Sequence, residues 1–195
     1  MKKIEGYLSI GKEFIEPEKF IPVVNSENQK PHGGFWATKH DLNSICYNDW
    51  MDYLTEQPHL IYYKYPDKYP IPAVFFTLKK EATILIVEHP GQYETLKRVH
   101  PGINNSIDFE ELSRDCDGIF INKSALSEEE LKDFSVSSLL LFNLDCIEEY
   151  RQADVFVEVD HKHGFALYEY NIVPKRKKYT IENGTILTRQ KKDVK

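Results

Sequence analysis

Short runs of apolar and aromatic residues, bounded by glycine, proline, asparagine and aspartate, recur along most of the chain. Runs of this length and composition predict β-strands. Expected strands are GYLSIG (6–11), GGFWAT (33–38), ATILIVEH (82–89), DGIFIN (117–122), SSLLLFN (137–143), DVFVEVD (154–160), GFALYEY (164–170) and KYTIENGTILTR (178–189). Two more strand-like runs flank a proline-rich turn within residues 61–80. So many strands are incompatible with an all-helical fold.

Helical signals are confined to the part of the chain between these strands. Three helices are expected, at residues 40–54, 91–99 and 106–116. The first places apolar residues near helical spacing, and Asp41 can cap its start. The third has Ser106 or Asp108 as its cap. Strands in both halves, helices between them and no repeat at a fixed period predict an α+β fold.

The 195 residues fit one domain, and 41% hydrophobic and 13% aromatic residues suffice for a core. We expect a single domain over residues 1–195, which ends in strands within 151–188 and a basic tail at 189–195. The net charge of −6 argues against extensive nucleic-acid binding. We interpret PKRKK (174–178) as a solvated strand edge and the tail as a frayed end.

Two observations favour a cytoplasmic protein without membrane contact. The sequence has no run of about eighteen apolar residues, and its first apolar stretch is interrupted before a signal-peptide core forms. Its cysteines, Cys46, Cys116 and Cys146, lie far apart and form no CxxC pair. We interpret them as buried, reduced thiols.

The sequence lacks the common motifs of nucleotide-binding proteins, zinc proteases and hydrolases. GxxxxGK[ST], GxGxxG, HExxH and GxSxG are all absent. VDHKHG places His161 and His163 on one strand face near Asp160, but no third ligand has a diagnostic spacing. A polar hairpin turn is therefore expected there, and no metal site.

One segment, KPHGGFWATKH (30–40), combines a glycine pair with two aromatic residues. Glycine permits a positive φ or a close backbone approach, and tryptophan offers a flat apolar face with one N–H donor. The combination suits a strand that holds a planar ring, or a turn that leads into a buried strand. Residues 16–32 before it are expected to form a long loop, and such loops are often functional.

The order of several segments resembles the ADP-ribosyltransferase superfamily, which includes poly-ADP-ribose polymerases, many bacterial toxins and several phage proteins. These segments are GGFWAT with its following helix, FFTLKKEATILIVEH, SIDFEELSRDCDGIFIN and FSVSSLLLFNLDCIEEYR. The resemblance covers residues 5–150 and rests on order and pattern. It implies two small, largely antiparallel sheets around a cleft, with short helices between strands. It also implies NAD as the substrate and a protein or nucleic acid as the target.

The resemblance places the nicotinamide ring of NAD on the strand that follows the glycine pair. Gly34, Phe35, Trp36 and Thr38 fall where the family stacks this ring, with Trp36 or Phe35 in place of the family's tyrosine. In the family's first strand, a His or Arg followed by Gly binds the two riboses.

This chain departs from the family pattern at two places. The first strand carries Ser9 and Gly11, of which only Gly11 clearly matches. The catalytic glutamate is expected at the start of the late strand, where Ser137 and Ser138 stand. A carboxylate there would stabilise the positive charge that develops on the ribose, whereas Ser138 can hold a hydroxyl but supplies no charge.

Another carboxylate could take the place of the missing glutamate. Asp117, Asp145 and Glu148 are the candidates, although Asp117 also suits a turn at the entry of a strand. Three hypotheses stay open. The chain is an NAD-using ADP-ribosyltransferase, or a catalytically silent member that binds a nucleotide-like ligand or a protein, or an unrelated α+β interaction protein.

Overall fold

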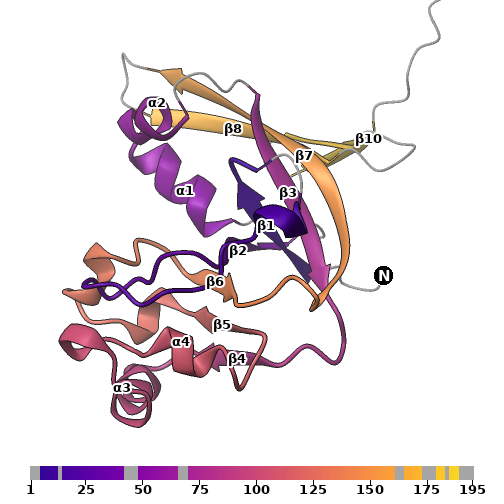
Figure 1. Ribbon diagram of the computed structural model, residues 1–195. Helices are drawn as coiled ribbons and strands as arrows, with labels where there is room; N and C mark the ends of the chain where they lie inside the picture. The colour runs from indigo at the N-terminus through magenta and orange to yellow at the C-terminus, as the bar shows by residue number, and fades with distance from the viewer. Residues whose placement is uncertain are drawn as a thin grey trace, which may run out of the picture. The chain divides into compact units, whose positions relative to one another are not determined.

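The chain has an α+β fold, in which short helices lie between β-strands (Figure 1). The computed structural model describes residues 5–12, 15–41, 48–65, 70–160, 165–172, 179–182 and 185–188. The chain divides into two compact units. Unit 1 comprises Met1–Ile15, Lys39–Thr77 and Glu149–Lys195, and unit 2 comprises Glu16–Thr38 and Leu78–Glu148. The expected single domain stays a prediction.

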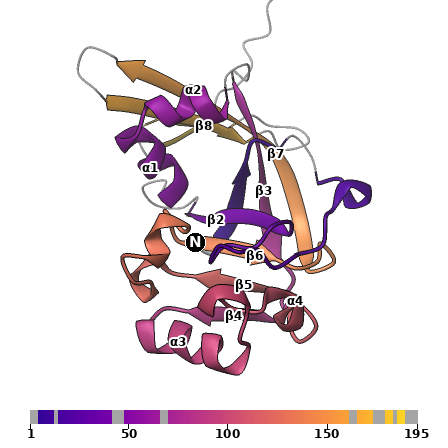
Figure 2. The same ribbon diagram turned by 60° about the vertical axis from the view of Figure 1, so that its left-hand side comes forward.

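Unit 1 is a largely antiparallel sheet with two helices. Its strands, in sheet order, are β10 (Thr185–Thr188), β9 (Tyr179–Glu182), β8 (Phe165–Ile172), β7 (Ile147–Asp160), β3 (Ile71–Leu78) and β1 (Glu5–Ile10). Leu8 pairs with Phe75 across β1 and β3, so both side chains point to one face. On that face they join a buried cluster with residues of α1 (Asp49–Glu56) and α2 (His59–Lys64). The helices thus cover the apolar face of this sheet (Figure 2).

Unit 2 is a mixed sheet with helical segments. Its strands, in sheet order, are β2 (Phe35–Asp41), β6 (Ser138–Leu141), β5 (Gly118–Ile121) and β4 (Ile84–Val87). β4 and β5 are parallel, and the other pairs are antiparallel. Trp36 pairs with Leu140, which pairs with Ile119, so these three side chains share a face and one buried cluster.

Helices and 3₁₀ turns supply the rest of the unit 2 core. The helices are α3 (Pro90–Val99) and α4 (Phe109–Leu112), and the turns are η1 (Pro17–Lys19), η2 (Ile103–Asn105), η3 (Lys123–Ala125) and η4 (Glu130–Lys132). Tyr93 of α3 and Phe109 of α4 are almost completely buried in the cluster. Phe134, which follows η4, is buried there too. Val23, in the loop before β2, belongs to the same cluster, so this loop and the segment after η4 are both attached to one core.

The expectation of two separate small sheets is wrong. The hydrogen-bonded strand order is continuous: β10-β9-β8-β7-β3-β1-β2-β6-β5-β4. The physical reason is the length of β2. This strand has seven residues, and pairing with β6 uses only three of them. Phe35 to Ala37 pair with β6, and the strand continues to Asp41.

Two predicted elements differ from the structure. The helix expected at residues 40–54 is wrong at its start, because β2 runs to Asp41 and α1 begins at Asp49. Its cap is Asn48, whose side chain accepts a hydrogen bond from Met51 N at 3.1 Å. The first strand-like run of residues 61–80 is also wrong: it begins within α2, whose Ile61 packs into the unit 1 core. Local sequence favoured a strand, and burial against the sheet selects a helix.

Most other predicted elements are confirmed, among them β1, β3, β4, β5, β6, α3 and α4. Asp108 caps α4 as expected, by accepting from Glu111 N at 2.9 Å. Cys116 and Cys146 are free thiols; Cys146 is buried, as expected, whereas Cys116 is only partly buried. Burial raises the pKa of Cys146 to about 11. Other predictions fall on Cys46, on His161 and His163, and on residues 174–178 and 189–195, which lie outside the described residues. Among the helices of the described residues, none is long and apolar enough to cross a membrane.

Candidate functional site

The indole of Trp36 has a fixed orientation. Its Nε1 donates a hydrogen bond to the carbonyl oxygen of Gly33 at 3.0 Å, which satisfies the only polar atom of the side chain. The ring is half-buried and packs against the hydrophobic cluster of unit 2. The strand therefore presents a rigid aromatic ring whose position depends on the turn before it.

The glycine pair before Trp36 forms that turn. Both residues have positive φ, 71° at Gly33 and 64° at Gly34, a region that side chains disfavour. A Cβ on Gly33 would collide with the carbonyl oxygen of Pro22, and one on Gly34 with the side chain of Leu140. The Gly34 N–H donates to Ile21 O at 2.8 Å. The glycines thus allow the 16–32 loop and β6 to approach the turn closely.

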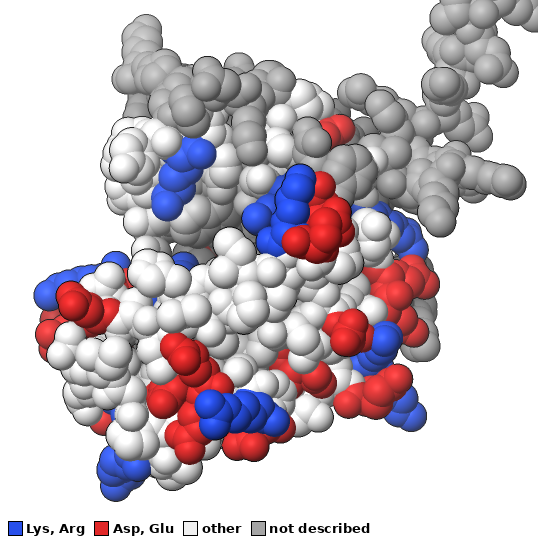
Figure 3. Space-filling view, in the orientation of Figure 1, with Lys and Arg blue, Asp and Glu red and all other residues white. Residues whose placement is uncertain are grey.

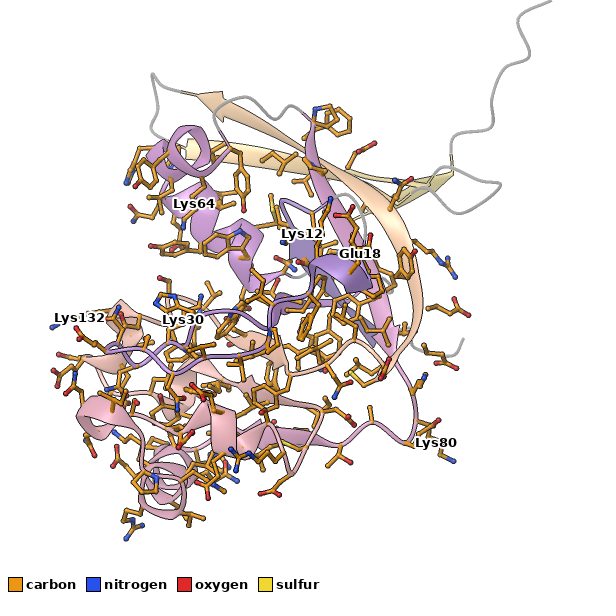
Figure 4. All side chains as sticks on the ribbon, viewed as in Figure 1. Lys12, Glu18, Lys30, Lys64, Lys80 and Lys132 are labelled. Carbon is orange, nitrogen blue, oxygen red and sulfur yellow. The ribbon has the colours of Figure 1, made fainter. Side chains whose placement is uncertain are left out.

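Two side chains lie against the indole. The ammonium nitrogen of Lys30 is 4.1 Å from the ring centroid, well inside the range of a cation–π interaction. The ring of Phe134 lies 6.1 Å away, centroid to centroid, and is tilted by 55°. Figure 4 labels Lys30 on the loop between η1 and β2. A cation and an aromatic ring therefore both contact the proposed ring-binding residue.

The neighbours of Trp36 are held by a network that links the loop to η4. The backbone N–H of Gln29 donates to Asp133 Oδ2 at 3.0 Å. Lys30 follows Gln29 in the chain and Phe134 follows Asp133, so this bond links the two segments that contact the indole. η4 itself is fixed by Glu130, whose Oε1 accepts from Lys97 Nζ at 2.6 Å while both side chains are buried. Burial alone would lower the pKa of the lysine and raise that of the glutamate.

Mutual hydrogen bonding reverses both of those shifts. The pKa of Lys97 is raised, because Glu130 and Glu94 accept from its ammonium, and the pKa of Glu130 is lowered. The pair is therefore charged at neutral pH. Removing Lys97 would leave the buried carboxylate of Glu130 without its ionic partner, which is strongly destabilising.

The candidate residues in β1 belong to unit 1. Ser9 is buried and pairs with Val74 of β3. Gly11 has a φ of +89° and donates from its N–H to Pro72 O at 2.6 Å. Tyr65 lies close to the position where a Cβ would be. A turn at the end of β1 therefore accounts for this glycine, and its assignment to ribose binding stays a prediction.

The other two candidates in β2 flank Trp36 and are buried. Phe35 pairs with Leu141 on the sheet face opposite to that of Trp36, and it is 7% exposed. Thr38 is 6% exposed. Of the aromatic pair, only Trp36 keeps part of its ring at the surface, so Trp36 is the better candidate for stacking on a ligand.

Both carboxylate oxygens of Asp117 accept hydrogen bonds. Oδ1 accepts from the side-chain amide of Asn143 at 2.9 Å, and Oδ2 accepts from Thr83 N at 2.8 Å. Its backbone N–H donates to Thr83 O, and its carbonyl accepts from Phe142 N. The hydrogen bond from Asn143 and then that from Thr83 lower the pKa of Asp117. This residue joins the segments that enter β4 and β5 and leave β6.

The serines that stand in place of the family's glutamate also bond to the backbone. Ser138 Oγ donates to Val136 O at 2.9 Å, and Ser137 Oγ accepts from Lys123 N at 3.3 Å. Ser138 pairs with Ile121, whereas Asp117 precedes Gly118 at the other end of β5. At about 3.3 Å per residue, Asp117 and Ser138 are about 13 Å apart along the sheet. The two candidate catalytic residues therefore do not form one site.

Ser138 lies nearer to Trp36. Trp36 pairs with Leu140, and Ser138 is two residues from Leu140 on β6, so both side chains belong to the same sheet face. Asp145 and Glu148 follow β6 and are exposed. The part of the chain that the structure describes contains no group of three or more residues able to hold a metal ion.

Sequence reasoning missed Lys30, Phe134 and Asn143 as partners of the candidate residues. Lys30 had a weak signal, because it begins the segment that contains the glycine pair. Phe134 and Asn143 had none, since their contacts depend on tertiary pairing.

On the face in Figure 3, basic and acidic side chains are interspersed over the described residues.

No protein-family model matches the chain, and neither does any curated protein or solved structure.

Proposed function

We propose that the chain is an ADP-ribosyltransferase-like protein that binds NAD and stacks its nicotinamide ring on Trp36. The observation that carries the proposal is the fixed, half-buried indole, whose N–H already bonds to Gly33 O at 3.0 Å. Such a ring can stack on a planar ligand without losing a hydrogen bond. The order of glycine turn, aromatic strand, α1 and late strand β6 supports the same relation.

The proposed reaction transfers ADP-ribose from NAD to a protein or nucleic acid, as in the toxins and phage proteins of this superfamily. The bond from the ribose to nicotinamide breaks, and a nucleophile of the target bonds to the ribose carbon. Positive charge develops on the ribose, so a nearby carboxylate would lower the barrier. Asp145 and Glu148 are exposed, and among the described residues their carboxylates have no hydrogen-bond partner, which makes them better candidates than Asp117.

A second candidate function is binding of NAD or a related nucleotide without catalysis. It is favoured by the hydrogen bonds of Asp117 and Ser138, the two residues that the sequence suggested for catalysis. Asp117 uses both carboxylate oxygens, and Ser138 donates its hydroxyl proton to Val136 O. Both residues are already committed to bonds within the protein, so each can offer a substrate only its remaining acceptor sites.

Two measurements test the proposal and separate its versions. NAD is titrated into the full chain by calorimetry, and labelled NAD is incubated with the protein and a cell extract. Binding together with transfer of label to a macromolecule supports the transferase. Binding without transfer across several extracts supports the silent module. Absence of both contradicts the proposal and favours an unrelated interaction protein.

A further inference from the structure

The indole of Trp36 carries a cation in the structure. Lys30 Nζ lies 4.1 Å from the ring centroid, on a loop that Gln29 ties to Asp133. The face of an aromatic ring is negative, and tryptophan binds cations best among the aromatic side chains. Lys30 therefore shows which chemistry this ring accepts: a positive charge placed over its face.

The second neighbour of the ring, Phe134, is apolar. Phe134 is 1% exposed and belongs to the buried cluster of unit 2, so it cannot easily be displaced. Lys30 is half-buried and lies on a loop, and its side chain has many rotamers. A ligand that stacks on Trp36 would therefore replace the lysine and leave the phenylalanine in place.

We propose that Lys30 occupies the ligand position on Trp36 and makes the site selective for a cationic planar ring. This inference rests on the proposed binding of NAD at Trp36 and extends it to the charge of the ligand. A cationic ring restores the cation–π interaction that is lost when Lys30 leaves, whereas a neutral ring does not. The oxidised nicotinamide ring is a cationic pyridinium, and the reduced ring is neutral. The site should therefore prefer the oxidised form.

The second tryptophan provides a matched control. In unit 1, Trp50 Nε1 donates to the Tyr65 hydroxyl at 3.1 Å, and Lys64 Nζ lies 5.3 Å from the ring. Tyr53 stacks on Trp50, with centroids 5.6 Å apart and planes 27° from parallel. Each tryptophan thus has a nearby lysine, and Trp50 has an aromatic partner stacked on it. Figure 4 labels Lys64 on α2.

The experiment is an NMR titration of the full chain with two small probes, the 1-methylnicotinamide cation and neutral nicotinamide. The sequence has two tryptophans, so two indole N–H signals arise, and Trp36→Phe assigns them. The cation should shift the Trp36 signal at lower concentration than nicotinamide does. Lys30→Ala should tighten binding of the cation by at least about two- to fivefold, the factor that one exposed cation–π contact represents. Lys64→Ala should leave this affinity unchanged.

A second variant, Lys30→Arg, guards against an effect of folding. Because arginine keeps a cation that can cover the indole, its affinity for the cationic probe should stay near that of the wild type. Equal affinity for the two probes, or a Lys30→Ala variant that binds the cation no more tightly, would overturn the role of Lys30. If NAD still binds in calorimetry, the proposed function survives that result. If neither NAD nor the probes bind to any variant, the proposed site itself is wrong.

Discussion

Trp36 and Asp117 belong to the same unit, and they differ in how much of their chemistry the protein already uses. The indole has its N–H satisfied by Gly33 O, and part of its ring stays at the surface under Lys30. The carboxylate of Asp117 has both oxygens occupied, by Asn143 and Thr83. A ligand can therefore bind at Trp36 at a lower cost in free energy than at Asp117. Substitution of Trp36 should change binding, and substitution of Asp117 should change fold stability.

The largest expected effect is on stability, at Asp117. Asp117→Asn replaces one acceptor oxygen by an NH₂ donor, which would face the Asn143 amide or the Thr83 N–H, both donors. Since one hydrogen bond to a charged group is lost, we expect the free energy of unfolding to fall by about 1.5–3 kcal/mol. Urea denaturation measures this difference.

The control for this substitution is Asp115→Asn. It makes the same change of charge two residues away, at an exposed side chain. Its effect should stay within about 0.5 kcal/mol. If the two variants are equally stable, the hydrogen bonds of Asp117 do not hold the three segments together, and a role in the reaction gains support.

A smaller effect on stability is expected at Ser138. Ser138→Ala removes the hydroxyl that donates to Val136 O and leaves this carbonyl without that donor. We expect a loss of about 1 kcal/mol in the free energy of unfolding, with unchanged affinity for NAD. Ser135→Ala, at an exposed serine, is the matched control. A loss of NAD affinity without a loss of stability would instead assign Ser138 to the ligand site.

At Trp36 the expected effect is on binding. Trp36→Leu keeps an apolar side chain against the core but removes the aromatic face, so NAD affinity should fall by about 0.5–1.5 kcal/mol. Calorimetry measures the affinity, and thermal melts measure the stability of the same samples. Trp50→Leu is the control, because its indole lies in unit 1 with Tyr53 stacked on it. Equal NAD affinities of wild type and Trp36→Leu would remove Trp36 from the proposed site.

The parts of the fold that the sequence predicts are those specified by local pattern. α4 follows from its capping signal at Asp108, and β4 follows from one continuous apolar run. The helix expected from residue 40 started too early, because an apolar spacing near 3.6 cannot locate the end of the preceding strand. Strand order was not predictable in the same way, since pairing joins residues far apart in sequence.

The candidate site shows the same limit. The glycine pair and Trp36 were recognisable because glycine and tryptophan have distinctive chemistry. The use of Asp117 was not, because its partners Thr83 and Asn143 lie 34 and 26 residues away along the chain. Both neighbours of the carboxylate are donors, and nothing in the sequence indicated either contact.

The smallest expected effect is a dependence of the Asp117→Asn difference on pH. Hydrogen bonds from Asn143 and Thr83 lower the pKa of Asp117 in the folded state, below its unfolded value of about 3.9. A lowered pKa means that the stabilisation is complete above pH 4 and is lost as the pH falls toward the folded-state value. The difference in unfolding free energy between wild type and Asp117→Asn should therefore be constant from pH 7 to 5 and shrink below pH 4.

The pKa of Asp108 is lowered too, through Asn25, but this residue is the same in both proteins, so its contribution cancels. Urea titrations of both proteins at several pH values measure the difference. If this difference stays constant down to pH 3, the two donors do not stabilise the carboxylate. Asp117 would then be as available to a ligand as the indole of Trp36.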